Sequence, residues 1–394
     1  MRKIVILAAL ALLFIDRASA QQCGSLSTNF ANDLCWFKNF VRPQLGVSDA
    51  EIFNYQTYSY GKNSYTLKND KAPWGGNYFS WKSGGLATRW AAYINEPSFP
   101  NSTQLDYSNV ANMTTAQLAR LSPAEKLDIY LGYKDFRITK QELKNRGPET
   151  SEIESWEGFC NGVRAAGALT PEPIKNVTVT SPDGKQIIFY PVDLKILIGA
   201  SYFYLGDFGY GQFGSNHSVA PNAGVFDIAL RLLIGDKEKV FFFDNNQSEQ
   251  IWNHSVIGYE RAITENMRAA RSGEVFPNNA TKLISYKLTL YHMGETSPED
   301  MNSPTKPRIS NLSPCCVERE IYNYTLYLNN NNKIVDGKWK NNLYPDAVWF
   351  AAGKGDDQNH TASRGIDPNT GKPYKGDGNL DHDKILQLVK MASN

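Results

Sequence analysis

After its first twenty residues, the 394-residue sequence has no apolar run as long as the roughly 18 residues that a membrane-spanning helix needs. Its charges nearly cancel, with 41 Lys and Arg against 40 Asp and Glu, so no strong field attracts nucleic acid or an anionic membrane. The sequence also lacks internal repeats, the phosphate-binding motifs GxGxxG and Walker A, and any cluster of histidines. These absences argue against nucleic-acid, nucleotide and membrane partners.

The long apolar run stands at the start of the chain. Residues 1–20 combine a basic start, an apolar stretch from Ile4 to Ile15, and small residues Ala18 and Ala20 near the end. This is the pattern of a secretory signal peptide cleaved before Gln21. We therefore expect a soluble, secreted, extracellular protein.

Asn-x-Ser/Thr sequons are consistent with that location, and each one that carries a glycan would be a surface position. Because the chain is rich in asparagine, some sequons arise by chance, and we expect only part of them to be used. They occur at Asn101, Asn112, Asn176, Asn216, Asn246, Asn253, Asn279, Asn311, Asn323 and Asn359.

Cysteine is scarce and odd in number, with five residues in a chain bound for an oxidising compartment. Cys23 and Cys35 are close enough to close a short loop, while Cys315 and Cys316 could bond each other or reach the N-terminal pair. Any pairing among those four leaves Cys160 alone. A single remaining thiol is either a buried small hydrophobe or a nucleophile.

Local patterns predict helices first and strands later. Ser122, Pro123 and Glu125 form a capping box at the start of a helix. NVTVTS and KQIIFYPV flank an Asp-Gly turn and predict a hairpin, and a helix follows in DLKILIGASYFYLG. The segments KLISYKLTLYHM, EIYNYTLYL, KIVDGKW and DAVWF predict an antiparallel sheet.

Cys160 stands in WEGFCNG, at the start of the predicted helix CNGVRAAGAL. A helix N-terminus favours a thiolate, and its N–H groups can form an oxyanion hole. We expect Trp156, Gly158 and Gly162 to leave room for a substrate chain. Papain-like acyl transferases and proteases are built this way, with a histidine base that an Asp or Asn orients.

Several segments, in the right order, resemble the oomycete and bacterial transglutaminase elicitor family. They are PWGGNYFSWKSGGLATRW, LSPAEKLDIYLG, WEGFCNGVRAAGALTPEP, IIFYPVDLKIL, NAGVFDIAL, IWNHSVIGYE and IVDGKWKNNLYPDAVWF, which together span most of residues 70–352. The resemblance implies a secreted protein related to enzymes that join glutamine and lysine side chains of proteins through an isopeptide bond. It also implies calcium as a candidate cofactor.

The resemblance assigns the nucleophile to Cys160 and the orienting carboxylate to Asp244, at the end of KVFFFD. The family's base is a histidine after the phenylalanine of NAGVF, and here that position is Asp227. An aspartate would repel the thiolate and raise its pKa, so most activity would be lost. His217 and His254 are candidate substitutes, although both are better explained as surface residues.

IWNHSVIGYE resembles the family's surface peptide that plants recognise, which implies a host immune receptor as a partner. Ser255 and Ile257 depart from the family pattern, and a glycan on Asn253 could mask the segment. The residues of this elicitor-like segment that fit the expectation of a surface site are Trp252, Asn253, His254, Val256 and Gly258.

The predicted fold class is α+β, with a papain-like cysteine acyltransferase core of helix plus antiparallel sheet. Residues 21–150 would form a helical and loop-rich part, 151–260 the transglutaminase-like core, and 261–394 a β-rich part, all in one integrated unit. The stretch DPNTG at 367–371 opens like a calcium loop but lacks the later Glu, so no dedicated metal site is predicted there.

Three hypotheses follow for the function. The chain is an active transglutaminase that uses another base, an inactive relative that acts by binding at a cell wall or host receptor, or a papain-like cysteine hydrolase. Position 227 separates the first from the second, because the first needs a base elsewhere.

Overall fold

The structure is a computed structural model of the whole chain. It describes residues 23–24, 29–90, 106–146, 153–205, 208–214, 219–245, 247–297, 300–305, 316–351 and 380–393. The predicted signal peptide, Cys315 and the 367–371 loop lie outside these residues.

Helices dominate the first half of the described chain, and α10, η2, η3 and α12 lie in the second half. The helices are α1 (Phe30–Leu45), α2 (Asp49–Tyr55), η1 (Gly85–Ala87), α4 (Tyr107–Val110), α5 (Thr115–Ala119), α6 (Pro123–Leu131), α7 (Arg137–Asn145), α8 (Cys160–Leu169), α9 (Pro191–Leu205), α10 (Ala223–Ala229), the π-helical η2 (Leu230–Lys237), η3 (Pro277–Asn279) and α12 (His382–Ser393).

Strands dominate the second half, and most of the strands form one large antiparallel sheet. The strands are β1 (Ser64–Thr66), β2 (Val177–Thr180), β3 (Gln186–Phe189), β4 (Phe208–Gly214), β5 (Phe242–Asp244), β6 (Asn253–Ala269), β7 (Lys282–Met293), β8 (Val317–Leu328), β9 (Ile334–Trp339) and β10 (Ala347–Ala351). The order in the large sheet is β4-β10-β5-β6-β7-β8-β9, with β1 added on β6, and β2 and β3 form a separate hairpin.

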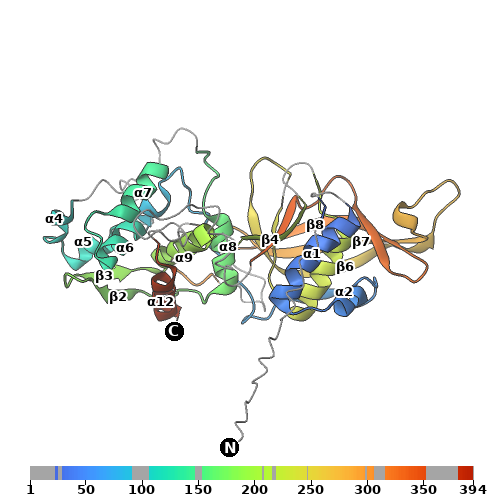
Figure 1. Ribbon diagram of the computed structural model, residues 1–394, viewed down its shortest axis with the longest axis horizontal. Helices are drawn as coiled ribbons and strands as arrows, with labels where there is room; N and C mark the ends of the chain where they lie inside the picture. The colour runs from blue at the N-terminus through green and yellow to red at the C-terminus, as the bar shows by residue number, and fades with distance from the viewer. Residues whose placement is uncertain are drawn as a thin grey trace, which may run out of the picture.

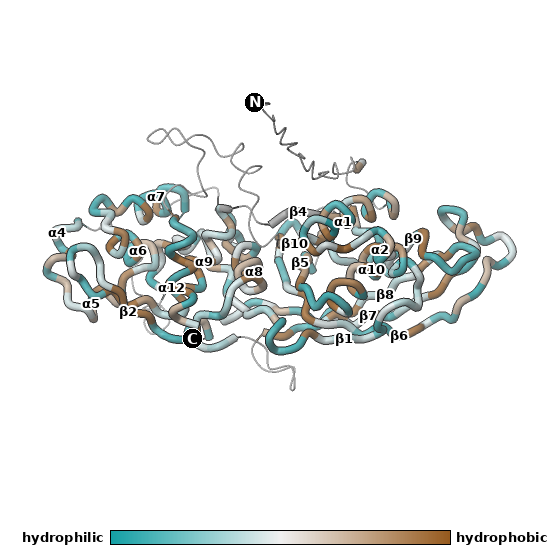
Figure 2. The backbone as a smooth tube through the Cα atoms, turned by 60° about the horizontal axis from the view of Figure 1, so that its bottom comes forward, coloured by the Kyte–Doolittle hydropathy of each residue, from teal (hydrophilic) through white to brown (hydrophobic). Residues whose placement is uncertain are grey.

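The molecule has two lobes, each with its own apolar core (Figure 1). In the sheet lobe, α1, α2 and α10 pack with the large sheet around residues such as Phe37, Phe226 and Tyr324. In the helical lobe, α6, α8, α9 and α12 surround residues such as Trp74 and Val163. The brown segments of the tube in Figure 2 gather inside both lobes, as expected for buried apolar side chains.

The chain crosses between the lobes more than once. Its N-terminal helices α1 and α2 lie in the sheet lobe, whereas its C-terminal helix α12 returns to pack on α9 in the helical lobe. Each core takes residues from all three predicted ranges, 21–150, 151–260 and 261–394. Neither lobe is therefore a continuous piece of the sequence.

Several local predictions are confirmed. The capping box at Ser122 and Glu125 starts α6, because the Ser122 side chain accepts from the Glu125 backbone and the Glu125 side chain accepts from the Ser122 backbone. The hairpin predicted around the Asp-Gly turn is β2 and β3, and the following predicted helix is α9. The strand segments predicted near the C-terminus are β7, β8, β9 and β10.

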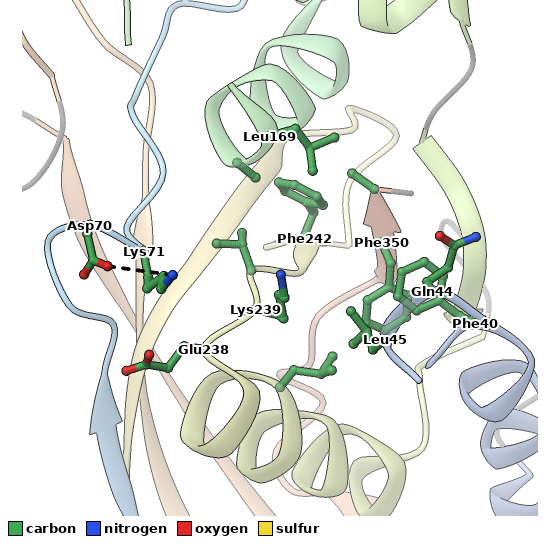
Figure 3. Close-up of a pocket in the computed structure, with 14 residues that line it drawn as sticks. Phe40, Gln44, Leu45, Asp70, Lys71, Leu169, Glu238, Lys239, Phe242 and Phe350 are labelled. Atoms are coloured by element: carbon green, nitrogen blue, oxygen red, sulfur yellow. Dashed lines mark ion pairs between the residues drawn. The ribbon is translucent and has the colours of Figure 1, made fainter. Parts of the chain in front are cut away.

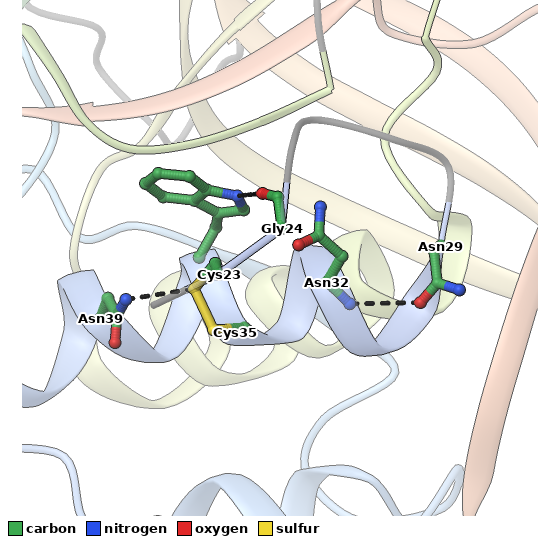
Figure 4. Close-up of a disulfide and its surroundings, with 7 residues drawn as sticks. Cys23, Gly24, Asn29, Asn32, Cys35 and Asn39 are labelled. Atoms are coloured by element: carbon green, nitrogen blue, oxygen red, sulfur yellow. Dashed lines mark hydrogen bonds between the residues drawn. A yellow bond between two sulfur atoms is a disulfide. The ribbon is translucent and has the colours of Figure 1, made fainter. Parts of the chain in front are cut away.

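A disulfide ties the start of the described chain to α1 (Figure 4). Cys23 bonds Cys35 across 12 residues, so the short-loop pairing is confirmed and neither residue is available to Cys315 or Cys316. Asn39 donates a hydrogen bond to the Cys23 sulfur at 3.2 Å, and the Trp36 indole donates to the Gly24 carbonyl at 3.1 Å. The bridge therefore holds the segment before α1 on the helix surface.

Removing this bridge should destabilise the sheet lobe. In the Cys23→Ser, Cys35→Ser variant we expect the free energy of unfolding to fall by about 2–3 kcal/mol, because the unfolded chain loses a short closed loop. Denaturant unfolding measures it, with and without reductant. Reductant should lower the stability of the wild type but not of the variant, and equal stability of both under oxidising conditions would contradict the account.

Candidate functional site

Cys160 is the first residue of α8 and lies where the two lobes meet. Its neighbour Phe159 is buried in the core of the helical lobe, while its thiol faces the beginning of β6 in the sheet lobe. The side chain is only 7 % exposed. The structure thus places the Cys160 thiol at a helix N-terminus, inside an interface between two packed units.

The thiol is held by an amide and not by a base. Asn253 donates from Nδ2 to the Cys160 sulfur at 3.2 Å, and the sulfur contacts the Ile251 carbonyl oxygen at 3.8 Å. The indole of Trp349 donates to Asn253 Oδ1 at 2.6 Å. An indole N–H is only a donor, so it fixes the orientation of the amide and turns the NH₂ group towards the sulfur.

These surroundings favour the neutral thiol. Burial raises the pKa of Cys160 above its ordinary value, and the nearby Glu295 carboxylate adds to the rise. The Asn253 hydrogen bonds and the Arg164 charge lower the pKa without cancelling the burial. Because the thiolate is the nucleophile, the site as built is poorly set up for attack at neutral pH.

Asp244, the predicted orienting carboxylate, lies beside this amide. In the β5 and β6 pairing, Asp244 stands directly opposite Asn253, and directly opposed residues have their Cβ atoms about 4.5–5.5 Å apart. Its carboxylate accepts from the Trp252 backbone N–H at 3.2 Å, and the side chain is buried. Asn253 therefore contacts the cysteine directly and has Asp244 as its cross-strand neighbour, so it holds the position next to the nucleophile that a catalytic triad gives to its base.

Arg164 fixes the relation between the two halves of the site. It lies one turn after Cys160 on α8, and its guanidinium donates to the Asn253 carbonyl at 2.9 Å and the Gly76 carbonyl at 3.0 Å. A third donor reaches the Glu295 carboxylate at 2.5 Å. One buried cation thereby ties α8, β6 and the segment after β7 together.

Asp227 is not at the thiol, which corrects its assignment to the base position. It is fully buried in the sheet lobe, where Arg231, Arg261 and Tyr324 all donate to its carboxylate. Arg261 lies eight residues along β6 from Asn253, roughly 27 Å at the usual rise of a strand. Burial raises the pKa of Asp227, but the two guanidiniums outweigh it and the pKa is lowered, so the group is a charged structural anchor.

The elicitor-like segment is not a surface peptide, which corrects a second prediction. Asn253, His254, Val256 and Gly258 are buried in the first half of β6, and Trp252 is half-buried before it. Val256, Ile257 and Tyr259 of the strand belong to the sheet-lobe core, and α8 also packs against the strand, which explains its unbroken burial. A glycan on Asn253 is excluded, since its amide contacts Cys160 and Trp349.

The glycines around Cys160 were expected to leave room for a substrate chain. Other segments of the protein pack against them instead. A Cβ at Gly158 would collide with the Tyr78 carbonyl, and one at Gly162 with the Gly199 carbonyl of α9. Both glycines therefore allow close backbone packing. Trp156, four residues before the cysteine, is half-buried.

Of the two candidate substitute bases, only His254 can be placed, and no hydrogen bond joins it to the thiol. His254 is buried on β6 and its Nδ1 lies 3.2 Å from the Met293 carbonyl, while His217 lies outside the described residues. Burial lowers the pKa of His254 well below its ordinary value and that of His292 to about 4. Within the described ranges, no histidine is hydrogen-bonded to Cys160.

A cavity of about 350 Å³ opens at the opposite end of α8 (Figure 3). Its lining includes Ala168 and Leu169 from the last turn of that helix, and Phe40, Phe242 and Phe350 from the sheet lobe. Cys160 is not among the lining residues. This cavity is therefore separate from the thiol.

Comparison with known proteins supports the resemblance seen in the sequence. The transglutaminase elicitor family model matches residues 204–368, and the predicted resemblance to that family is confirmed. The structure resembles the GP42 transglutaminase from Phytophthora sojae, with a TM-score of 0.60, 17 % sequence identity, and coverage of 87 % of this chain and 97 % of that one. No curated protein matches the chain.

These findings define the class of protein. At 17 % identity the structural match concerns the fold, and it confirms the predicted α+β class with a helical N-terminal part and a β-rich C-terminal part. Over residues 204–368 the chain is similar to the transglutaminase elicitor family, and its fold is similar to that of a transglutaminase. In the part of the chain that the structure describes, no helix is long and apolar enough to cross a membrane.

The sequence-based assignment placed Asn253 in the elicitor-like segment and not at the thiol, and it missed Trp349. The available signal was the hairpin-like spacing: KVFFFD is followed after eight residues by NHSVIGY, which places Asn253 opposite Asp244 if the two strands pair. No local pattern distinguishes that register from its neighbours, and a one-residue slip would turn the asparagine away from the cysteine.

Replacement of Asp227 should affect stability and not the thiol. In Asp227→Asn, two buried arginines lose their countercharge, so the free energy of unfolding should fall by about 3–5 kcal/mol. Thermal and denaturant unfolding measure it, with the exposed Asp183→Asn as the control, for which we expect less than about 1 kcal/mol. Unchanged stability with an altered Cys160 alkylation rate would place Asp227 at the thiol after all.

The alkylation rate of Cys160 should be low at neutral pH and should rise with pH. Each unit by which the pKa is raised lowers the neutral-pH thiolate fraction about tenfold. Iodoacetamide labelling followed by peptide mass spectrometry separates Cys160 from the other cysteines. The rate should still be increasing as the pH passes the ordinary thiol pKa of 9.0, and a plateau reached below that pH would show an activated thiol.

Proposed function

We propose that this protein is a secreted transglutaminase-like protein with little acyl-transfer activity, which acts by binding protein partners. The observation that carries the proposal is the contact between Cys160 and Asn253. The fold, the nucleophile position and the buried Asp244 are present, while the side chain that contacts the thiol is an amide.

An amide cannot perform the first step of isopeptide transfer. The thiol must lose its proton to attack a glutamine carboxamide, after which ammonia leaves and a lysine amine resolves the thioester. Asn253 offers the sulfur an N–H donor and has no lone pair that takes up a proton at neutral pH. Loss of an essential base from a nucleophilic site lowers the rate by several orders of magnitude.

The same deficiency weighs against both enzymatic alternatives. An active transglutaminase and a papain-like hydrolase differ in whether an amine or water resolves the acyl-enzyme, but both need the thiolate first. The raised pKa of Cys160 therefore disfavours them equally. Binding is the remaining alternative, and it does not require the thiolate.

Location and partners are parts of this proposal. The signal-peptide pattern of residues 1–20 and the Cys23–Cys35 disulfide support secretion. Glutamine- and lysine-bearing protein surfaces, a cell wall or a host immune receptor are the proposed partners, and calcium remains the cofactor that the family resemblance implies. Because β6 is buried, a host receptor would have to bind a different surface of the folded protein.

Incorporation of a fluorescent primary amine into a glutamine-rich acceptor protein tests the proposal. We expect no labelling by the wild type above the Cys160→Ala background. Asn253→His should introduce labelling that depends on Cys160, because it places an imidazole next to the thiol and opposite Asp244 on the neighbouring strand. Asp227→His should not.

The indole of Trp349 needs its own arm in this experiment. Its N–H donates to the side chain at position 253. In Asn253→His it could donate to the imidazole nitrogen whose lone pair must accept the thiol proton. Asn253→His is therefore tested alone and together with Trp349→Phe. Labelling by the wild type that disappears in Cys160→Ala would overturn the proposal.

A further inference from the structure

Three adjacent strands bring His254, His292 and Glu318 together on the sheet. They come from β6, β7 and β8, and His292 stands directly opposite Glu318 in the β7 and β8 pairing. One ligand-type atom from each residue lies within 4.8 Å of the others. We propose that these residues form a binding site for a zinc-type divalent transition-metal ion.

The state of His292 points to a missing ligand. The residue is 0 % exposed, and neither of its ring nitrogens makes a hydrogen bond of standard length and angle within the described part of the chain. Leaving a buried polar group without a partner costs on the order of 1–3 kcal/mol, so nearly all such groups are satisfied in folded proteins. A metal bound to one ring nitrogen would satisfy it.

His254 and Glu318 are positioned to bind the same ion. The Nδ1 of His254 lies 3.2 Å from the Met293 carbonyl, which fixes the hydrogen there and leaves Nε2 as a lone-pair donor. The exposed Glu318 folds back over Gly294, where a Cβ would collide with its carboxylate. The glycine thereby lets the carboxylate lie close to the two rings.

Two imidazole nitrogens and one carboxylate oxygen are the ligand set of open zinc sites, which leave a fourth position for water. Hard ions such as calcium and magnesium prefer oxygen ligands alone. A tetrahedral ion with bonds of about 2.1 Å needs ligand atoms roughly 3.4 Å apart. The cluster must therefore close by rotation of side chains, which the long and exposed Glu318 allows.

The charges around the cluster favour a cation. Arg164 is the nearby positive group, and it is already paired with Glu295 at 2.5 Å. Glu318 belongs to the cluster, and the Glu320 carboxylate lies 4.0 Å from His292 Nε2. Two carboxylates therefore remain to balance a divalent ion.

The site is distinct from the thiol site but lies directly behind it. His254 follows Asn253 on β6, and consecutive side chains of a strand point to opposite faces. Phe243, a residue of the sheet-lobe core, packs against both imidazole rings. A bound ion would fix three strands where they support the Cys160 contact.

Metal titration of the full secreted chain, expressed without an affinity tag and stripped with chelator, tests the proposal. Zn²⁺ is followed by calorimetry and Co²⁺ by its visible absorption, whose intensity reports tetrahedral nitrogen and oxygen ligands. We expect one ion per chain and a raised Tm, with no competition from calcium or magnesium. His292→Leu and Glu318→Gln should each weaken binding at least about tenfold.

Matched controls are His382→Gln, a histidine of the helical lobe, and Glu260→Gln, an exposed carboxylate on β6. Both should bind like the wild type. Binding that neither His292→Leu nor Glu318→Gln reduces would overturn the proposal, as would a wild type that binds no more tightly than Glu318→Gln. If His292→Leu does not fold, the surface variant Glu318→Gln decides alone.

Discussion

The buried guanidinium of Arg164 holds the two lobes in the relation on which the site depends. Through three donors it joins α8 to β6, to the Gly76 carbonyl and to Glu295. With that clamp in place, the first residue of α8 must face the first residue of β6. The thiol of Cys160 therefore meets the side chain at position 253, whatever residue the sequence supplies there.

What the sequence supplies is an asparagine, and the chemistry of the site follows from that choice. The amide satisfies a neutral thiol by donating to it, and the Trp349 indole keeps the amide in that orientation. Burial also favours the neutral thiol, because it raises the pKa of Cys160. The arrangement stabilises a resting cysteine at the seam of two lobes, with an intact carboxylate nearby.

Local chemistry made much of the fold predictable, while the site depended on long-range pairing. The capping box of α6 and the Asp-Gly hairpin are set by neighbouring residues, so their prediction succeeded. The burial of β6 was missed because α8, about ninety residues away in sequence, covers it. Asp227 was misassigned because Arg261, the long-range partner of its carboxylate, becomes apparent only once β6 is placed, whereas Arg231 is a local partner one helical turn away.

The central claim is that position 253 decides whether Cys160 can be acylated. Intact-mass spectrometry of the chain, incubated with a glutamine peptide and no amine acceptor, measures that step directly. The account expects no thioester adduct on the wild type and an adduct, with loss of ammonia, on Asn253→His. A Cys160 adduct on the wild type, absent from Cys160→Ala, would contradict it.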